Sequence, residues 1–324
     1  MSMLTIVPVG IHAGATGVHD VSAPSRSLAT PSSRPARAPK LPRYGLFISA
    51  EWYTHEPEAI DLIWATATRL RHLQRDCPIF VEVCCDHSGP SPQYPITPVC
   101  HWENKTGSET REALDALRLA GDVTILRYIH TSKMHNPAGC CRPADTVGNI
   151  TARVTEELRA SASDGIFFDD VMATPEYMPI YRASWNASQG SKTKRVVAFN
   201  PDCLKPHIPG HNPWCKDTPE EYMQMGDYHV LYEGLAAAFN PDTSQVRWKV
   251  SEYRDKMTAY IYNASVAEWK SLIDRGRAAG FTKFCVTGTK AEGPPGPNPG
   301  WPSFLDEMAD YLAALNAEAR IAAR

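Results

Sequence analysis

Eight short apolar segments alternate with amphipathic segments along most of this chain, and this rhythm constrains the fold most strongly. The apolar segments are rich in β-branched and aromatic residues, which favours strands. They lie at residues 45–52, 78–84, 123–130, 165–170, 195–200, 228–233, 257–262 and 281–287. The segments that follow them are predicted as helices at 58–74, 108–120, 149–160, 179–187, 219–225, 241–253, 266–279 and 301–323. Eight strand–helix repeats predict an α/β fold, the (β/α)8 TIM barrel.

An open, doubly wound sheet is the alternative arrangement of such elements. That fold would be expected to carry a glycine-rich phosphate loop after its first strand, and the stretch ISAEWYTHEP contains no glycine. The predicted strands are also continuously apolar, as parallel strands covered on both faces are. The barrel is therefore the preferred prediction.

Length and composition set the domain boundaries. A barrel can occupy one domain of a 324-residue chain, and we assign residues 43–324 to a single barrel domain. Residues 1–42 are predicted to be a disordered tail or linker, because residues 21–42 are rich in Pro, Ser, Ala and Arg without apolar periodicity. The first nine residues lack the basic region of a classical signal peptide, so we expect none. The net charge of -3 gives no case for a nucleic-acid partner, and we expect no membrane span.

The nine cysteines leave the compartment open. Their number is odd, and none has the paired CxxC spacing of a zinc site. Six fall in or near presumed loops, where disulfides are plausible in an exported protein. Reduced thiols in a cytoplasmic protein are the other interpretation of the same residues.

The predicted strand at 165–170 ends in two adjacent carboxylates, Asp169 and Asp170. Two like charges side by side repel each other, and each costs free energy if it is desolvated. In a barrel, however, catalytic groups lie at the C-terminal ends of the strands. Glu233 ends another predicted strand, so carboxyl groups from two strands could flank a glycosidic bond. The structural alternative is that these aspartates cap helices or pair with Arg127 on the neighbouring strand.

Aromatic, amide and histidine side chains follow the other predicted strands. This mixture is typical of carbohydrate sites, where rings stack on sugar faces and amides bind hydroxyls. The candidate substrate-binding residues are Trp52, Asp86, His87, Tyr128, His130, Asn200, Tyr232 and Tyr262. The histidines have no neighbours at metal-ligand spacing, so we expect no metal and no cofactor. A serine hydrolase is disfavoured because the Gly-x-Ser-x-Gly motif is absent.

From about Leu46 to Tyr311 the chain resembles the spherulation-specific (spherulin-4-like) family. The matching pieces, in order, are PIFVEVCCDHSGP, TILRYIHTSKM, SDGIFFDDV, VVAFNP, DYHVLYEG and AGFTKFCVTG. The resemblance implies a (β/α)8 glycoside hydrolase that cleaves α-1,4-linked N-acetylgalactosamine in fungal galactosaminogalactan. It also implies catalytic roles for Asp169, Asp170 and Glu233. The second acidic position is commonly Glu in the family and is Asp170 here, which withdraws that carboxyl by about 1.5 Å.

These observations lead to one main hypothesis and two rivals. The main hypothesis is an endo-acting hydrolase of an amino-sugar polysaccharide, with Asp169 as nucleophile or base, Glu233 as general acid and Asp170 sharing the proton, although the three roles could permute. The first rival is a non-catalytic carbohydrate-binding or developmental cell-surface protein on the same barrel. The second is a metal-dependent barrel lyase or isomerase with Asp169 and Asp170 as ligands. We expect a monomer whose partner is a polysaccharide. The resemblance favours a secreted or cell-surface location, and a cytoplasmic one stays open.

Overall fold

The chain divides into two units, Met1–Lys40 and Leu41–Arg324, and the structure describes residues of the second. The structure is a computed structural model. It describes residues 43–50, 57–70, 76–83, 105–121, 123–130, 147–160, 163–169, 171, 175, 177–190, 195–201, 218–241, 243, 246, 248–288 and 304–324. The predicted tail at 1–42 lies outside these residues.

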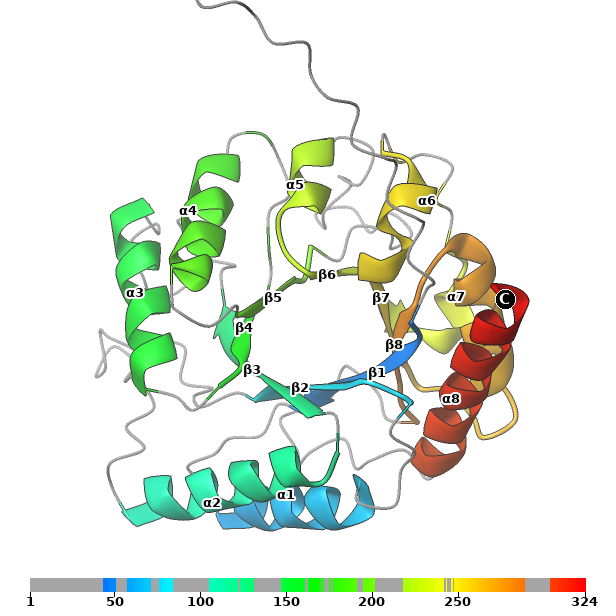
Figure 1. Cartoon of the computed structure of the whole chain (residues 1–324), viewed down its shortest axis with the longest axis horizontal. Coiled ribbons are helices and arrows are strands. Elements are labelled where there is room, and N and C mark those ends of the chain that lie inside the picture. Colours follow the sequence, from blue (N-terminus) through cyan, green and yellow to red (C-terminus); the bar gives the residue numbers. More distant parts are fainter. Residues whose placement is uncertain are drawn as a thin grey trace, which may run out of the picture. The chain divides into compact units, whose positions relative to one another are not determined.

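Eight parallel strands form a closed barrel in sequence order, with the first strand paired to the last (Figure 1). They are β1 (Gly45–Ala50), β2 (Ile79–Val83), β3 (Val123–His130), β4 (Gly165–Asp169), β5 (Val196–Phe199), β6 (Tyr228–Leu235), β7 (Met257–Tyr262) and β8 (Lys283–Val286). The helices that surround this ring are α1 (Pro57–Leu70), α2 (Lys105–Leu119), α3 (Val147–Ala160), α4 (Met178–Gln189), α5 (Glu220–Gln224), α6 (Val250–Tyr253), α7 (Trp269–Ala279) and α8 (Leu305–Ala322). The predicted (β/α)8 barrel is confirmed.

The helix predicted at 241–253 is much shorter than expected. Among the described residues of this segment, only those of α6 at its end are helical, and a short 3-10 turn at Arg254–Lys256 follows. The stretch PDTSQ that opens this segment explains the difference, because Pro, Asp, Thr and Ser favour turns over helix interiors.

Two apolar layers hold the barrel together, one inside the ring of strands and one between the strands and the helices. The inner layer takes one buried side chain from each of seven strands: Phe47, Phe80, Leu126, Phe167, Ala198, Val230 and Tyr260. The ring of Phe47 lies 5.7 Å from that of Phe167 and 5.4 Å from that of Tyr260. These aromatic rings fill the barrel interior, so polar side chains at the C-terminal ends of the strands lie above a packed floor.

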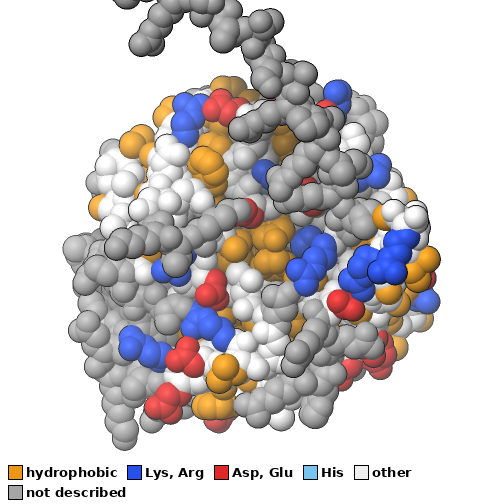
Figure 2. All heavy atoms as spheres, in the orientation of Figure 1, with side chains coloured by type: hydrophobic (Ala, Val, Ile, Leu, Met, Phe, Trp, Pro, Cys, Tyr) orange, Lys and Arg blue, Asp and Glu red, His pale blue; other side chains and the backbone are white. Residues whose placement is uncertain are grey.

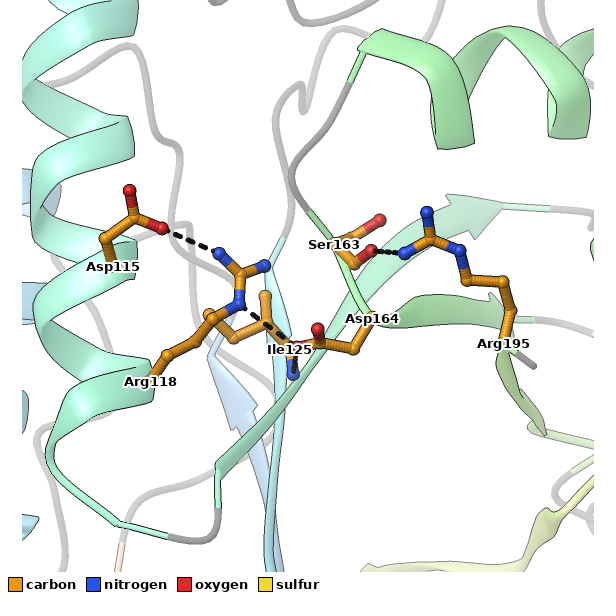
Figure 3. Close-up of polar contacts among 6 residues, drawn as sticks. All are labelled: Asp115, Arg118, Ile125, Ser163, Asp164 and Arg195. Atoms are coloured by element: carbon orange, nitrogen blue, oxygen red, sulfur yellow. Dashed lines mark hydrogen bonds and ion pairs between the residues drawn. The ribbon is translucent and has the colours of Figure 1, made fainter. Parts of the chain in front are cut away.

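The N-terminal end of β4 is fixed by Asp164 (Figure 3). Its Oδ2 accepts hydrogen bonds from the backbone N–H of Ile125, at 2.9 Å, and from Arg118 Nε, at 3.3 Å. The next residue must be glycine, because a Cβ on Gly165 would lie 1.9 Å from the carbonyl oxygen of Val196. Asp164 and Gly165 therefore set the register of β4 at the end of the barrel opposite its C-terminal carboxylate.

Asp227 repeats this arrangement before β6. Its Oδ2 accepts a hydrogen bond from the backbone N–H of Val197 at 3.1 Å, and its own N–H donates to the carbonyl of Val197 at 2.7 Å. An aspartate at the start of β4 and another at the start of β6 thus each bond the preceding strand.

The C-terminal helix is bonded to the first strand. Asn316 on α8 accepts a hydrogen bond from the N–H of Tyr44 at 2.6 Å and donates to the carbonyls of Tyr44 and Asp76. Buried Lys283 on β8 donates to the carbonyl of Arg43 at 2.7 Å. These bonds join the two ends of the barrel domain where β1 meets β8.

The surface shown in Figure 2 carries charges of both signs. Hydrophobic side chains gather near the centre of this face, Lys and Arg side chains lie beside them, and acidic side chains are scattered around them. No described helix is long and apolar enough to cross a membrane. The described part of the chain contains Cys77 and Cys285, whereas the six loop cysteines considered for disulfides lie outside it.

Candidate active site

Two carboxylates meet at the C-terminal end of the barrel, one from β4 and one from β6. They belong to Asp169 and Glu233, and the side chain of Asn200, which follows β5, lies between them. The amide nitrogen of Asn200 donates to Asp169 Oδ1 at 2.7 Å and to Glu233 Oε2 at 2.5 Å. The strand between the two acids thus supplies a single donor group that bridges both of them.

A tyrosine hydroxyl also donates a hydrogen bond to each carboxylate. The hydroxyl of Tyr128 on β3 donates to Asp169 Oδ2 at 2.7 Å, and that of Tyr262 on β7 donates to Glu233 Oε1 at 2.6 Å. Asn200 is buried at 3 % exposure, while both carboxylates are half-buried. The two acids are therefore held by matched donors and still reach solvent.

Strand alternation aims four of these five side chains into the barrel. Asp169 lies two residues after Phe167, and Asn200 two after Ala198, both of which belong to the inner layer. Tyr128 and Tyr262 also pack against that layer. Because side chains on a strand alternate between its faces, residues two apart point the same way.

Glu233 faces inward because of a β-bulge. The pairing of β6 with β7 shifts register between Val230 and Tyr232, so that one extra residue lies in β6. Val230 belongs to the inner layer, whereas Leu231 and Tyr232 both belong to the outer one. The extra residue restores the inward direction at Glu233.

The same bulge keeps Tyr232, a predicted substrate-binding residue, away from the site. Its side chain is fully buried, its ring packs against Phe239 at 4.7 Å, and its hydroxyl donates to the carbonyl of Leu235. The structure therefore brings together Tyr128, Asp169, Asn200, Glu233 and Tyr262 of the predicted residues, but not Tyr232.

The side chains of the remaining candidate residues are not described by the structure. His130 ends β3, and only its backbone is described. Trp52, Asp86, His87 and Asp170 lie outside the described residues. Their roles stay predictions. In the part of the chain that is described, no three His, Cys, Asp or Glu side chains are grouped closely enough to hold a metal ion.

A third inward-facing acid, Glu82 on β2, was missed by the sequence analysis. It lies two residues after Phe80 of the inner layer, is only 2 % exposed, and accepts a hydrogen bond from the Tyr260 hydroxyl at 3.3 Å. Burial raises the pKa of the Tyr260 phenol well above its ordinary value, and the negative charge of Glu82 raises it further. Tyr260 is therefore a neutral donor at physiological pH. The signal in the sequence was one charged residue inside the apolar run PIFVEVC.

The sequence matches the model of spherulation-specific family 4 over residues 100–315, two thirds of the chain. The chain belongs to this family. The matched span contains Asp169, Asn200 and Glu233, whereas β1 and β2, with Glu82, precede it. A search of curated proteins found no significant match.

Solved structures with a similar fold include several glycoside hydrolases. An endo-β-1,4-glucanase from Xanthomonas axonopodis pv. citri, carrying three mutations, is 9% identical, with a TM-score of 0.50 over 84% of this chain and 99% of that chain. A second endo-β-1,4-glucanase from the same organism is 9% identical, with a TM-score of 0.50 over 85% and 99%. The PgaB glycoside hydrolase domain from Bordetella bronchiseptica is 11% identical, with a TM-score of 0.46 over 85% and 98%. This member of spherulation-specific family 4 thus has a barrel like those of the two glucanases.

Proposed function

We propose that this chain is a retaining, endo-acting glycoside hydrolase of an amino-sugar polysaccharide. The observation that carries the proposal is the amide of Asn200 between Asp169 and Glu233. Two oxygens that lie 2.7 and 2.5 Å from one nitrogen are no more than about 5.2 Å apart, the sum of those distances. Retaining glycosidases hold their carboxyl groups about 5–5.5 Å apart, whereas inverting enzymes keep them about 6.5–9.5 Å apart to admit a water.

The two carboxylates divide the chemistry between them. Asp169 attacks the anomeric carbon, and a covalent glycosyl–enzyme forms as the glycosidic C–O bond breaks. Glu233 gives its proton to the departing oxygen, then removes a proton from the water that hydrolyses the intermediate. We assign the nucleophile to Asp169 because Tyr128 and Asn200 fix its short side chain, and the acid/base to Glu233 because its additional methylene gives it more reach.

The substrate we propose is a polymer of α-linked N-acetylgalactosamine or galactosamine. The family motifs in this sequence support it, since the resemblance implies such a polymer. Because polysaccharides of this kind lie outside the cell, we also propose that the protein is secreted or displayed at the cell surface. Asp170 stays a candidate for sharing a proton with Asp169, and Asp86 and His87, which follow the second strand, stay candidates for sugar binding.

Release of oligosaccharides from a galactosamine-containing exopolysaccharide tests the hydrolase. We expect release by the wild type, none by Asp169→Asn or Glu233→Gln, and normal release by Asp164→Asn, whose aspartate lies at the opposite end of the same strand. Proton NMR of the first product formed from an α-linked substrate should show the α-anomer. A β-anomer would disprove retention. Binding without release by the wild type would favour a non-catalytic carbohydrate-binding protein, and loss of release on adding a chelator would favour the metal-dependent rival.

Azide rescue tests the assignment of the two roles. With an activated α-glycoside, azide should restore turnover to Asp169→Ala and give the β-glycosyl azide, because azide takes the place of the nucleophile. The same anion should restore turnover to Glu233→Ala and give the α-glycosyl azide, because it intercepts the covalent intermediate. The opposite pattern of products would exchange the two roles.

A further inference from the structure

Glu82 is a buried carboxylate that the proposed chemistry leaves unused. It faces the barrel interior at 2 % exposure, and its Cα neighbours in the sheet are Ser49 on β1 and Leu126 on β3. Removing a carboxylate from water costs several kcal/mol, and an apolar residue of similar size would fill this place at no such cost. A position occupied against stability in this way is a candidate for function.

Tyr260 connects Glu82 to the site. Its hydroxyl donates to Glu82 Oε2, while its Cα is paired with that of Glu233 in the ladder between β6 and β7. Its ring lies parallel to that of Phe167, with an interplanar angle of 3° and 6.2 Å between centroids. Phe167 is two residues before Asp169 on the same face of β4. One aromatic side chain therefore lies beneath both strands that carry the proposed catalytic acids.

The hydrogen bond from Tyr260 to Glu82 fixes the orientation of that ring. Glu82 comes from β2, on the side of the barrel away from β6, so the bond spans the interior rather than linking neighbouring strands. Without an acceptor on β2, the phenol would have to find another partner within the barrel, because a buried hydroxyl without one is costly. Moving the ring would disturb its contacts beneath Asp169 and Glu233.

We propose that Glu82 is a positioning residue, which holds Tyr260 so that Tyr260 in turn keeps Asp169 and Glu233 at their working separation. This inference rests on the proposed hydrolase function. It assigns Glu82 no contact with substrate. It does assign the buried carboxyl group a purpose that packing does not explain.

Kinetics of Glu82→Met, which removes the acceptor, Tyr260→Phe, which removes the donor, and the double variant test the proposal. We expect each single variant to lose about 10- to 100-fold in kcat with KM changed less than about threefold, since misplaced catalytic groups slow chemistry more than binding. The double variant should lose no more than about twofold beyond the worse single variant, because both changes break one connection. Independent, multiplying losses would overturn the proposal, as would a wild-type kcat in Glu82→Met.

Thr258→Val is the matched control. Thr258 is a buried polar residue two positions before Tyr260 on β7, so its side chain also faces the interior but lies nearer the N-terminal end of the strand, further from the carboxylates. We expect its kcat to stay within about twofold of the wild type. An equal loss of kcat in this control would show that any change in the interior slows the enzyme, and would remove the special role of Glu82.

Thermal unfolding separates this inference from the hydrolase proposal. A buried polar pair retained for positioning costs stability, so the double variant Glu82→Met with Tyr260→Phe, which replaces both partners by apolar groups, should unfold at the same temperature as the wild type or at a higher one. A clearly lower Tm would identify Glu82 as a structural residue and overturn the inference. This outcome is decided even if the wild type releases no sugar, a result that would contradict the hydrolase proposal instead.

Discussion

At the scale of single residues, Asn200 is the residue of the site that donates hydrogen bonds to both carboxylates. Its amide nitrogen has two hydrogens and meets one oxygen of each acid, so both carboxylates depend on the same group. Two carboxyl groups so close together repel each other whenever both are ionised, and a shared donor offsets part of that repulsion. An amide from the intervening strand can serve both acids in this geometry.

Replacing Asn200 with alanine should therefore separate the two acids. We expect kcat/KM to fall about 100-fold, because a displacement of about 1 Å in a catalytic group has that effect. Steady-state kinetics on a defined oligosaccharide would measure the loss, and circular dichroism would show whether the fold persists. Activity close to that of the wild type in a folded Asn200→Ala protein would mean that the bridge is dispensable.

His229 is a buried residue whose contribution to the free energy of unfolding depends on pH. Its ring is fully buried, packs 4.9 Å from Tyr222 and bonds the carbonyl of Met225 at 2.9 Å. Burial lowers its pKa from 6.5 to about 3, with a smaller contribution from the charge of Lys256. The unfolded chain takes up this proton near pH 6.5, so the folded state loses stability as the pH falls from 6.5 towards 3.

The protein should lose up to about 1.4 kcal/mol of unfolding free energy per pH unit through His229 in that window. Urea unfolding at pH 7, 6, 5 and 4 would measure the slope, with His229→Gln alongside. The variant should show a shallower slope below pH 6.5, since glutamine does not titrate. Parallel slopes for the two proteins would contradict the prediction.

At the scale of elements, β4 has a carboxylate at each end with opposite purposes. Asp164 at its start satisfies the backbone N–H of Ile125 and bonds Arg118, whereas Asp169 at its end accepts hydrogen bonds from Tyr128 on β3 and from Asn200, which follows β5. The strand is five residues long, so a short rigid segment separates a structural acid from a proposed catalytic one.

The same substitution at the two ends should give opposite results. Asp164→Asn should lower the unfolding free energy by about 1 kcal/mol through a weakened, partly exposed contact and leave kcat unchanged. Asp169→Asn should abolish turnover and leave stability unchanged or higher, because a proposed catalytic acid is replaced by a neutral amide of nearly the same size. Urea unfolding and oligosaccharide release, measured on both variants, would check this pair. Loss of turnover in both would mean that the two ends of β4 are not independent.

Two features of the site could not be predicted from strand patterns: the direction of Glu233 after the bulge in β6, and the buried acid Glu82 in β2. Asp169 and Asn200 could be placed from their strand ends alone, and alternation then determines their direction. Tyr232 and Glu233 are adjacent, and the sequence does not reveal which of them faces the interior because the extra residue depends on pairing with β7. Glu82 was overlooked because its neighbours make the segment read as continuously apolar.

At the scale of the whole molecule, eight repeats were sufficient to predict the closed barrel, since the count and continuity of the apolar runs leave few other arrangements. Helix lengths were harder to predict. α6 is a single turn because local turn-forming residues outweigh a weak apolar pattern, whereas the short helix predicted at 219–225 is confirmed as α5. The contacts that close the ring, through Asn316 and Lys283, depend on residues some 240 positions or more apart, which no local pattern reveals.

Lys283, which helps to close the barrel, should also make the stability of the protein depend on pH in alkaline solution. Burial lowers the pKa of Lys283 from 10.5 to about 7. Between these values the unfolded chain binds the proton and the folded protein has released it, so stability should rise with pH from 7 towards 10. The rise should reach at most about 1.4 kcal/mol per pH unit. Urea unfolding at pH 7, 8 and 9 should show a steeper increase for the wild type than for Lys283→Met, and equal increases would contradict the assignment.

The extra residue in β6 also bears on how related sequences are compared. An alignment that scores only residue similarity will tend to keep the sixth strand free of gaps. A relative without the bulge would then have its inward acid at the position of Tyr232, and the column of Glu233 would hold a residue that faces the helices. The glutamate could be judged lost in such a protein when it has only moved by one place. Counting residues from the start of the sixth strand to its acid would distinguish a lost catalytic group from a shifted one.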